Sequence, residues 1–326
     1  MIKLNMNDLE KSILSTLTYY DILGCPLTSW EIFKYLNKKG DFEVDLNKIL
    51  NILNSSSELS KFINQKNGLY FLKGRQKIVK QRIERQIIAD KKWKKAKWVI
   101  RFLQIIPYIR MVVVSGSLAM NNTKEESDID LLIIVKAGRI WTCRAFTTLF
   151  IHMIGQRRHG NLTKNRFCLN HYITDQSLEI PWQSLYNAQT YSHLVLIWEK
   201  KGLYKKFQKA NQWINDYLVN YPTIEKGYLT TIESNKLFKF IRKFREKILD
   251  TWFGNVLEYF LKKIQEGKIR KEPLTYKAGG RVIFNDKQLE FHPDSPEKRI
   301  LERYNKKIIK LGFKELGVEK DSGLTT

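Results

Sequence analysis

Hydrophobic periodicity divides the chain into a helical start, a strand-rich middle and a mostly helical end. Helical spacing of apolar residues predicts three short helices near the N-terminus, at residues 7–22, 26–37 and 45–56. Two short apolar runs then flank Asn67-Gly68, which is a strong signal for a β-hairpin. Three helices followed by a hairpin are typical of a winged helix, so we predict a winged-helix-like domain over residues 1–74.

The winged-helix prediction leaves two uses open. The domain could read nucleic acid with its third helix, or it could serve as a packing or dimerisation module. The third helix, DLNKILNILNSS, offers few arginines or amides for contacts with bases, which favours the packing module.

Residues 75–106 read as one long basic helix that links the N-terminal domain to the rest of the chain. Its KKWKKAKW segment could contact phosphates and stack tryptophans on bases. An amphipathic helix with inward tryptophans and solvated lysines explains the same pattern, and we favour that interpretation.

The middle of the chain carries the strand signals. In VVVSGSLAMNNTKEESDIDLLIIV, residues 112–135, two β-branched apolar runs predict two buried strands. A helix follows at 140–155, and alternation in RFCLNHYIT predicts a third strand at 166–174. We take 107–180 as the core domain. Residues 181–326 form a mostly helical C-terminal region, including 184–200, with a short β-hairpin between RVIFN and LEFHP.

The charge balance indicates an anionic partner. Lys and Arg number 57 against 33 Asp and Glu, which gives a formal net charge of +24. Nucleic acid, a nucleotide or a lipid surface would suit this excess, and a solvated lysine-rich surface would also account for it. A hydrophobic content of 43% is sufficient for a folded core and excludes a disordered chain.

The cysteines and histidines give no local metal or disulfide signal. The three cysteines lack paired spacing, and the five histidines lack an HExxH-like pattern, which argues against a disulfide framework and a zinc site. The longest weakly polar run, at 145–155, is too short to span a bilayer, and the first residues lack a signal-peptide pattern. We expect a cytoplasmic protein with no membrane partner. The sequence does not indicate an oligomeric state.

Asp128 and Asp130 are the first candidates for chemistry. Residues two apart in a strand point to the same face, so the two carboxylates lie side by side while Ile129 points into the core. Two like charges so close are costly unless a cation neutralises them. Mg²⁺ is commonly held by one or two carboxylates together with substrate phosphates, so the pair predicts a metal site.

Gly116 and Ser117 lie at the end of the preceding strand. Glycine lets a phosphate approach the backbone closely, and the Ser117 hydroxyl adds a donor. A short helix within LAMNNTKE would direct backbone amides at an anion. A phosphate cradle on one strand would thus face a carboxylate pair on the next.

These motifs resemble the DNA polymerase β-like nucleotidyltransferase superfamily, in which Gly-Ser is followed by Asp-x-Asp and an apolar strand. Here the motif is Gly116-Ser117 and Asp128-Ile129-Asp130. The wider layout resembles uncharacterised bacterial nucleotidyltransferase-domain proteins with an N-terminal winged helix. The resemblance implies an α+β fold with a small mixed-sheet core. It also implies two Mg²⁺ ions held by the aspartates, and an NTP whose β- and γ-phosphates contact Gly116 and Ser117.

The chain departs from the family at the third carboxylate. The third predicted strand has Asn170 in that place, and an amide can offer an oxygen to a metal but cannot act as a general base. Asp175 could replace the missing acid by reaching back, or it could be an ordinary turn residue. His171 should point to the face opposite Asn170. Either the first two aspartates suffice, or transfer is weak or lost.

Basic residues near the motif could clamp a triphosphate. Arg144 and Arg166 are the preferred candidates, because one lies in the helix after the metal strand and the other begins the third strand. Further basic candidates are Lys124, Arg157, Arg158 and Lys164.

Two functions are consistent with these observations. The first is a Mg²⁺-dependent nucleotidyltransferase that moves an NMP from an NTP to a hydroxyl or phosphate acceptor and releases pyrophosphate. The second is a winged-helix nucleic-acid-binding protein whose transferase core is weak or inert. The acidic acceptor pocket of an aminoglycoside-type transferase fits this basic chain less well.

Overall fold

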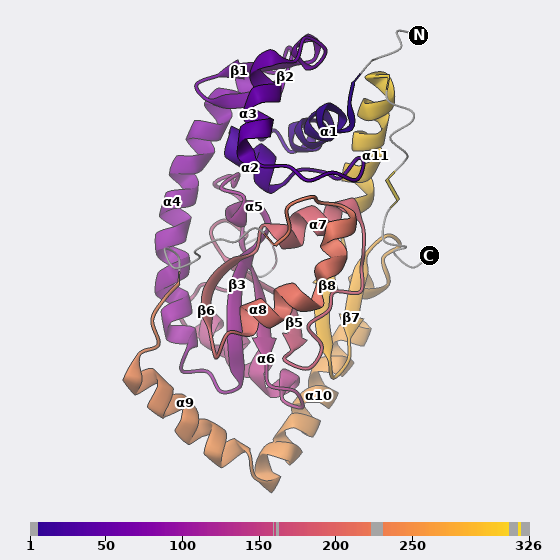
Figure 1. Ribbon diagram of the computed structural model, residues 1–326. Coiled ribbons are helices and arrows are strands. Elements are labelled where there is room, and N and C mark those ends of the chain that lie inside the picture. Colours follow the sequence, from indigo (N-terminus) through magenta and orange to yellow (C-terminus); the bar gives the residue numbers. More distant parts are fainter. Residues whose placement is uncertain (1–5, 159, 161–162, 223–230, 313–318, 321–326) are drawn as a thin grey trace.

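A computed structural model describes residues 6–158, 160, 163–222, 231–312 and 319–320. Among these residues, six strands form one mixed sheet that helices cover on both faces (Figure 1). The sheet agrees with the predicted α+β class.

The strand order of the sheet is β6 (Val195–Glu199), β3 (Ile109–Ser115), β4 (Ile129–Val135), β5 (Phe167–Thr174), β8 (Gln288–His292) and β7 (Arg281–Phe284). β4 and β5 run parallel, and the other neighbours pair antiparallel. The two strands predicted on either side of the Gly-Ser and Asp-x-Asp motif are therefore adjacent at the centre of the sheet.

The apolar character of β3 and β4 follows from burial on both faces. On one face, Val113, Leu132 and Ile134 join the core that extends to the N-terminal helices. On the other face, Val112 and Leu131 pack in a second core.

The second core contains residues of α4 (Lys77–Leu103) and α6 (Ile140–Met153), and α10 (Trp252–Lys271) packs on α6. The first core contains residues of α7 (Leu185–Ser192) and α8 (Leu203–Ala210). The predicted linker helix is confirmed as α4, and its buried residues make it part of the core.

The N-terminal part contains α1 (Asp8–Ile22), α2 (Ser29–Lys34) and α3 (Leu46–Ser55), followed by the antiparallel hairpin β1 (Ile63–Lys66) and β2 (Leu69–Leu72). The order is the predicted one, and the winged-helix assignment stays a prediction. The C-terminal helix α11 (Glu297–Lys310) packs beside α1, where the hydroxyls of Ser15 and Tyr304 are 2.7 Å apart (Figure 1).

Two features differ from the prediction for residues 181–326. Helix was predicted through 184–200, but α7 ends at Ser192 and the run Val195–Glu199 forms strand β6. The β-branched and aliphatic residues of this run pair with β3 because a sheet edge is available there. Strands β6, β7 and β8 join the same sheet as β3–β5, so the predicted boundary at residue 180 runs through that sheet.

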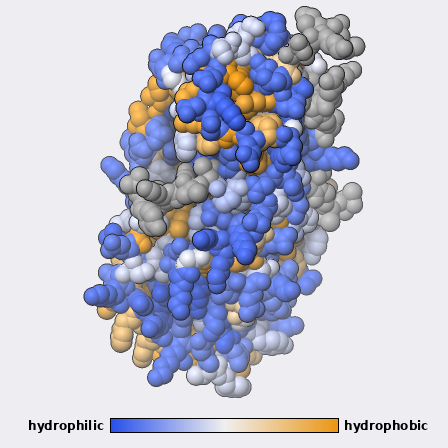
Figure 2. Space-filling model, viewed as in Figure 1, coloured by the Kyte–Doolittle hydropathy of each residue, from blue (hydrophilic) through white to orange (hydrophobic). Residues whose placement is uncertain are grey.

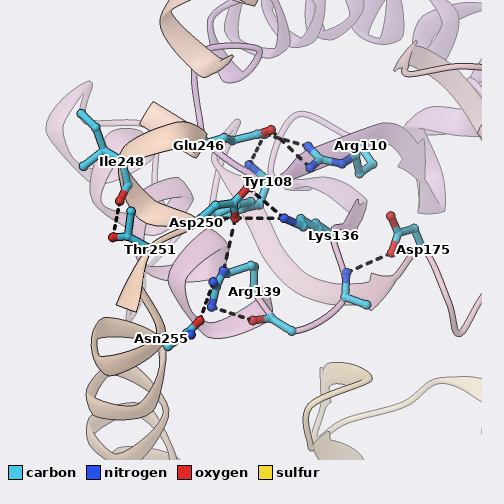
Figure 3. Close-up of polar contacts among 12 residues, drawn as sticks. Tyr108, Arg110, Lys136, Arg139, Asp175, Glu246, Ile248, Asp250, Thr251 and Asn255 are labelled. Carbon is cyan, nitrogen blue, oxygen red and sulfur yellow. Dashed lines mark hydrogen bonds and ion pairs between the residues drawn. The ribbon is translucent and has the colours of Figure 1, made fainter. Parts of the chain in front are cut away.

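Helix α9 (Lys236–Leu249) lies at the end of the sheet, where Leu249 joins the second core and several polar contacts attach the helix (Figures 1 and 3). The Glu246 carboxylate accepts from the Tyr108 N–H at 2.8 Å and from Arg110 Nη1 at 2.7 Å. Asp250, just after the helix, accepts from Lys136 Nζ at 2.9 Å and from the Tyr108 hydroxyl at 3.1 Å.

Hydrophilic side chains cover most of the face seen in Figure 2, and hydrophobic surface gathers near its top, over the N-terminal helices. Within the described residues, none of the helices combines the length and the apolar character that crossing a membrane requires.

The attachment of α9 gives a first prediction. Glu246→Ala leaves the buried Arg110 guanidinium and the Tyr108 N–H without their carboxylate, so we expect a loss of about 2–4 kcal/mol in the free energy of unfolding. Lys247→Ala, an exposed neighbour on the same helix, should change it by less than about 0.5 kcal/mol. Urea unfolding of both variants measures the difference, and equal losses would contradict the assigned role.

Candidate active site

Gly116 and Asp130 face each other across the central strand pair. Ser115, the last residue of β3, pairs with Asp130 of β4, and Gly116 begins the short helix α5 (Gly116–Ala119) with φ +66°. A Cβ atom on Gly116 would lie 2.5 Å from Asp130 Oδ2. Only glycine fits here, because both the backbone conformation and the close approach exclude a side chain. The short helix expected within LAMNNTKE lies earlier, at Gly116–Ala119, and the carbonyl oxygen of Ser117 accepts from the Asn122 N–H at 2.9 Å.

The two aspartates are brought together as predicted. The carboxylates of Asp128 and Asp130 and the Cys168 thiol each offer an atom within 4.8 Å of the others. Ile129 is fully buried between them. Burial, followed by the charge of Asp128, raises the pKa of the Asp130 carboxyl to about 7, against the charge of Arg158 and a hydrogen bond from Cys168.

Arg158 supplies the cation at this carboxylate pair. Its Nη1 lies 2.5 Å from Asp128 Oδ2 and 3.3 Å from Cys168 Sγ. The Arg158 N–H donates to the Phe167 carbonyl oxygen at 3.1 Å, which holds this segment beside the start of β5. Among the basic residues considered from the sequence, Arg158 is therefore the one that contacts an aspartate of the pair.

The residue next to Asp130 in the sheet register is Cys168, two positions before Asn170. The register then shifts, so that Leu132 pairs with His171, and β5 contains one extra residue. Asn170 and His171 both line the cavity beside Asp130. The prediction that they point to opposite faces is wrong, because it assumed strict alternation along β5.

Lys92 and Trp93 of α4 hold the loop that carries Asp128. The buried Lys92 ammonium donates to Thr123 Oγ1 at 3.1 Å, to the Ser127 carbonyl oxygen at 2.7 Å and to the Lys124 carbonyl oxygen. Trp93 Nε1 donates to Asn121 Oδ1 at 2.7 Å. Part of the KKWKKAKW segment thus has a structural role at the site.

A cavity of about 240 Å³ begins at Gly116 and Asp130 and extends between β5, β8 and α7. Side chains at its walls include those of Arg158, Asn170, His171, Tyr191, Arg281 and His292. Tyr191 comes from α7, whereas Arg281 and His292 come from β7 and β8. The site therefore includes residues from the C-terminal region.

Asp175 does not join the aspartate pair. In the parallel β4–β5 register, Ile129 pairs with Phe167 and Val135 with Thr174, so Asp175 follows the opposite end of the strand. Its carboxylate accepts from the Ala137 N–H at 2.9 Å (Figure 3). The prediction that Asp175 reaches back as a catalytic acid is corrected by this geometry, and a turn residue is what the structure shows.

Arg144 does not lie at the phosphate side of the site. Its Nη1 donates to Gln265 Oε1 at 2.6 Å, and its guanidinium stacks over Phe291 at 4.7 Å. Burial lowers the pKa of Arg144, and the charge of Tyr172 opposes this. Because Tyr172 belongs to the core on the other face of the sheet from Leu132, Arg144 cannot serve as the predicted clamp.

Arg166 contributes its backbone to the site. Its carbonyl oxygen accepts from the Ile129 N–H at 2.8 Å, which aligns the start of β4 with β5. One guanidinium nitrogen lies 3.9 Å from the position of a Cβ on Gly155, and burial, followed by the Arg166 charge, lowers the pKa of Lys95 on α4. The structure thus places the Arg166 side chain near Gly155 and α4, and its contact to a phosphate stays a prediction.

The donor set of the pair fits a hard divalent cation in part. Two carboxylates suit Mg²⁺ when phosphate oxygens and water complete the coordination. Burial, followed by the charges of Asp130 and Asp128, raises the pKa of the Cys168 thiol, so it stays protonated near pH 7. A protonated sulfur is a poor ligand for Mg²⁺, so the fit rests on Asp128 and Asp130.

Comparison with known proteins bears on the same residues. Residues 96–249 match the family model of the nucleotidyltransferase domain. The match supports the nucleotidyltransferase superfamily for this part of the chain, which contains Gly116, Asp128 and Asp130. Searches of the curated proteins and of the solved structures found no match.

The fit of glycine at position 116 gives a second prediction. Gly116→Ala should abolish binding of Mg²⁺–NTP and destabilise the fold, because its Cβ would overlap the Asp130 carboxylate. Gly138→Ala is the matched control, since Gly138 also has a positive φ but has no atom within 4 Å of its Cβ position. The control should lose only about 1–2 kcal/mol and keep nucleotide binding. Calorimetry and thermal unfolding measure both effects, and equal behaviour of the variants would contradict the steric argument.

The raised pKa of Asp130 gives a third prediction, for protein kept free of divalent cations with a chelator. A carboxyl whose folded-state pKa is raised stabilises the fold fully below its unfolded pKa, and this contribution is lost as pH rises through the folded value. Wild type should therefore lose stability between about pH 4 and 7 relative to Asp130→Asn. Above that range the variant should be more stable by about 1–4 kcal/mol.

Unfolding free energies across this pH range provide the measurement. Glu125→Gln, an exposed acidic neighbour, should follow the wild-type profile. Parallel profiles for wild type and Asp130→Asn would show that Asp130 titrates normally.

Proposed function

We propose that this protein is a Mg²⁺-dependent nucleotidyltransferase that moves an NMP from an NTP to an acceptor and releases pyrophosphate. The observation that carries the proposal is the Asp128–Asp130 pair beside Gly116, within residues that match the nucleotidyltransferase domain. The acceptor is a hydroxyl or phosphate group whose identity the proposal leaves open.

The aspartates are the proposed metal ligands. One or two Mg²⁺ ions bound there would neutralise charge on the triphosphate and on the attacking oxygen. Asp130 is fixed by its pairing with Ser115, and Asp128 by the loop that Lys92 holds. Both carboxylates are thus positioned before substrate binds, which reduces the cost of reorganisation in the transition state.

Gly116 and Ser117 are the proposed phosphate contacts. Gly116 brings the backbone close to Asp130, so an oxygen bound at this turn would lie near the proposed metal ligands, and Ser117 offers a hydroxyl in the following position. Arg158, now paired with Asp128, is the proposed basic contact to the triphosphate, because a metal ion on Asp128 would release its guanidinium.

At the third family position, this chain has no carboxylate that could take the proton of the acceptor hydroxyl. Cys168 lies next to Asp130 with its thiol protonated, and Asn170 cannot act as a base. Catalysis would then depend on positioning and charge neutralisation, for which Asp128 and Asp130 suffice. An Asn170 oxygen as a further metal ligand remains part of the proposal.

The fourth prediction tests this function. Isothermal calorimetry of each NTP with Mg²⁺ should show binding to wild type and none to Asp128→Asn/Asp130→Asn. Transfer of the NMP from a labelled NTP should fall by at least about 100-fold in Asp128→Asn and in Asp130→Asn, because each substitution removes a charge that acts in the transition state. Glu125→Gln removes an exposed carboxylate three residues from Asp128 and is the matched control, which should keep binding and transfer.

Full transfer activity in either aspartate variant would overturn the proposal. Absence of NTP binding in wild type would favour the alternative, a nucleic-acid-binding protein with an inert core.

A further inference from the structure

A second group of side chains that could ligate a metal lies beside the same cavity, whose wall includes two of them, His171 and His292. His171 comes from β5, and Glu290 and His292 come from β8. Each offers one ligand atom within 4.8 Å of the others. The group is separate from Asp128, Asp130 and Cys168, and the proposed transfer reaction does not use it.

The sheet itself brings these three side chains together. His171 and Glu290 are direct partners in the antiparallel β5–β8 register. His292 lies two residues after Glu290, so both point to the same face of β8. The extra residue in β5 turns His171 to that face, and therefore the backbone fixes the grouping before any ligand binds.

His171 has a buried nitrogen with no partner. The residue is only 5% exposed, and its Nε2 has no hydrogen-bond partner among the described residues. The nearest carboxylate oxygen, Glu290 Oε2, is 3.8 Å away, beyond hydrogen-bond distance. A buried polar atom without a partner costs free energy, and this one belongs to a residue that lines the cavity. The position is thus suited to a ligand that accepts a nitrogen lone pair.

We propose that His171, Glu290 and His292 bind one divalent transition-metal ion, with Zn²⁺ as the representative. Two imidazoles and one carboxylate are a donor set typical of zinc and of non-haem iron. The same set is unsuited to Mg²⁺, which prefers oxygen ligands. The two sites of the cavity therefore differ in the metal that they select.

Arg281 does not block this site. Its Nε lies 2.6 Å from Glu290 Oε1, and its Nη1 lies 3.6 Å from Glu297 Oε2, so the guanidinium is shared between two buried carboxylates. Glu290 Oε2 is the oxygen nearer to His171, and it accepts from Gln288 Nε2 at 2.8 Å. A carboxylate has about four lone-pair positions, so Glu290 can ligate a metal and keep both neighbours.

Asn170 is the positioning residue of the proposed site. Its amide nitrogen lies 3.2 Å from His292 Nδ1. Rotation of the amide by half a turn places its oxygen there instead, as an acceptor for an Nδ1–H proton. His292 Nε2, 3.6 Å from Glu290 Oε1, then presents its lone pair to the metal. A ligating histidine commonly has such a partner on its second nitrogen.

Three protein ligands leave part of the coordination shell open. The open side faces the cavity, where water or a small molecule with an oxygen or nitrogen donor could complete the shell.

The fifth prediction uses Asp128→Asn/Asp130→Asn as the parent protein, so that the nucleotide site cannot bind the probe metal. We expect one equivalent of Zn²⁺ by calorimetry, and visible d–d absorption on addition of Co²⁺. His171→Ala, Glu290→Gln and His292→Ala should each weaken binding by more than about 100-fold, since removal of an outer partner alone costs about 10–100-fold. His152→Ala, at an exposed histidine on α6, is the control and should leave affinity unchanged.

Asn170→Ala tests the positioning residue, which is not itself a proposed metal ligand. It should weaken Zn²⁺ binding by about 10–100-fold while stoichiometry stays the same. Circular dichroism should show that each variant is folded. Absence of Zn²⁺ binding by the folded parent, or equal affinity in the three ligand variants, would overturn the proposal. A thiolate-to-cobalt charge-transfer band would assign the metal to Cys168 and overturn it as well. Because the assay contains no nucleotide, these outcomes are independent of transfer activity.

Discussion

The structure around the candidate active site depends on two carboxylates that repel each other and are held close together at the end of an apolar sheet. Asp128 and Asp130 cannot move apart, because the fully buried Ile129 fixes the start of β4 between them. Their surroundings reduce the cost of that repulsion without removing it. Arg158 pairs with Asp128, and the raised pKa of Asp130 shows that one negative charge is still disfavoured. A bound divalent cation would neutralise this repulsion most directly.

Two parts of the chain build the cavity beside the aspartates. The nucleotidyltransferase-domain match ends at residue 249, and it includes the aspartates, Gly116 and Arg158. Strands β7 and β8 lie beyond the match, yet they extend the sheet on the β5 side and add Arg281 and His292 to the cavity wall. Residues outside the matched region therefore shape the part of the cavity that lies between β5 and β8.

Local sequence signals predicted the parts of the fold whose cause is local. The apolar runs of β3 and β4, the hairpin at Asn67-Gly68 and the long helix α4 follow from periodicity and turn chemistry. The aspartate pair was found because residues two apart in a strand share a face, and Gly116 was found because it ends the strand next to it. Lys92 and Arg158 act on residues about 30 or more positions away, so nothing in their own segments distinguished them from solvated basic residues. β6 was missed because its strand pairing depends on the exposed edge of β3.

Asn170 shows how one extra residue in a strand changes what a motif implies. Counting along RFCLNHYIT assigned Asn170 to the third acidic position, but the register sets Cys168 beside Asp130. The register shift that follows turns both Asn170 and His171 toward the cavity, where Asn170 contacts His292. The amide therefore belongs as much to the β5–β8 side of the cavity as to the aspartate pair. An acid at this position would add a negative charge to a cavity wall that already contains Asp130, so the amide has a structural reason that is independent of catalysis.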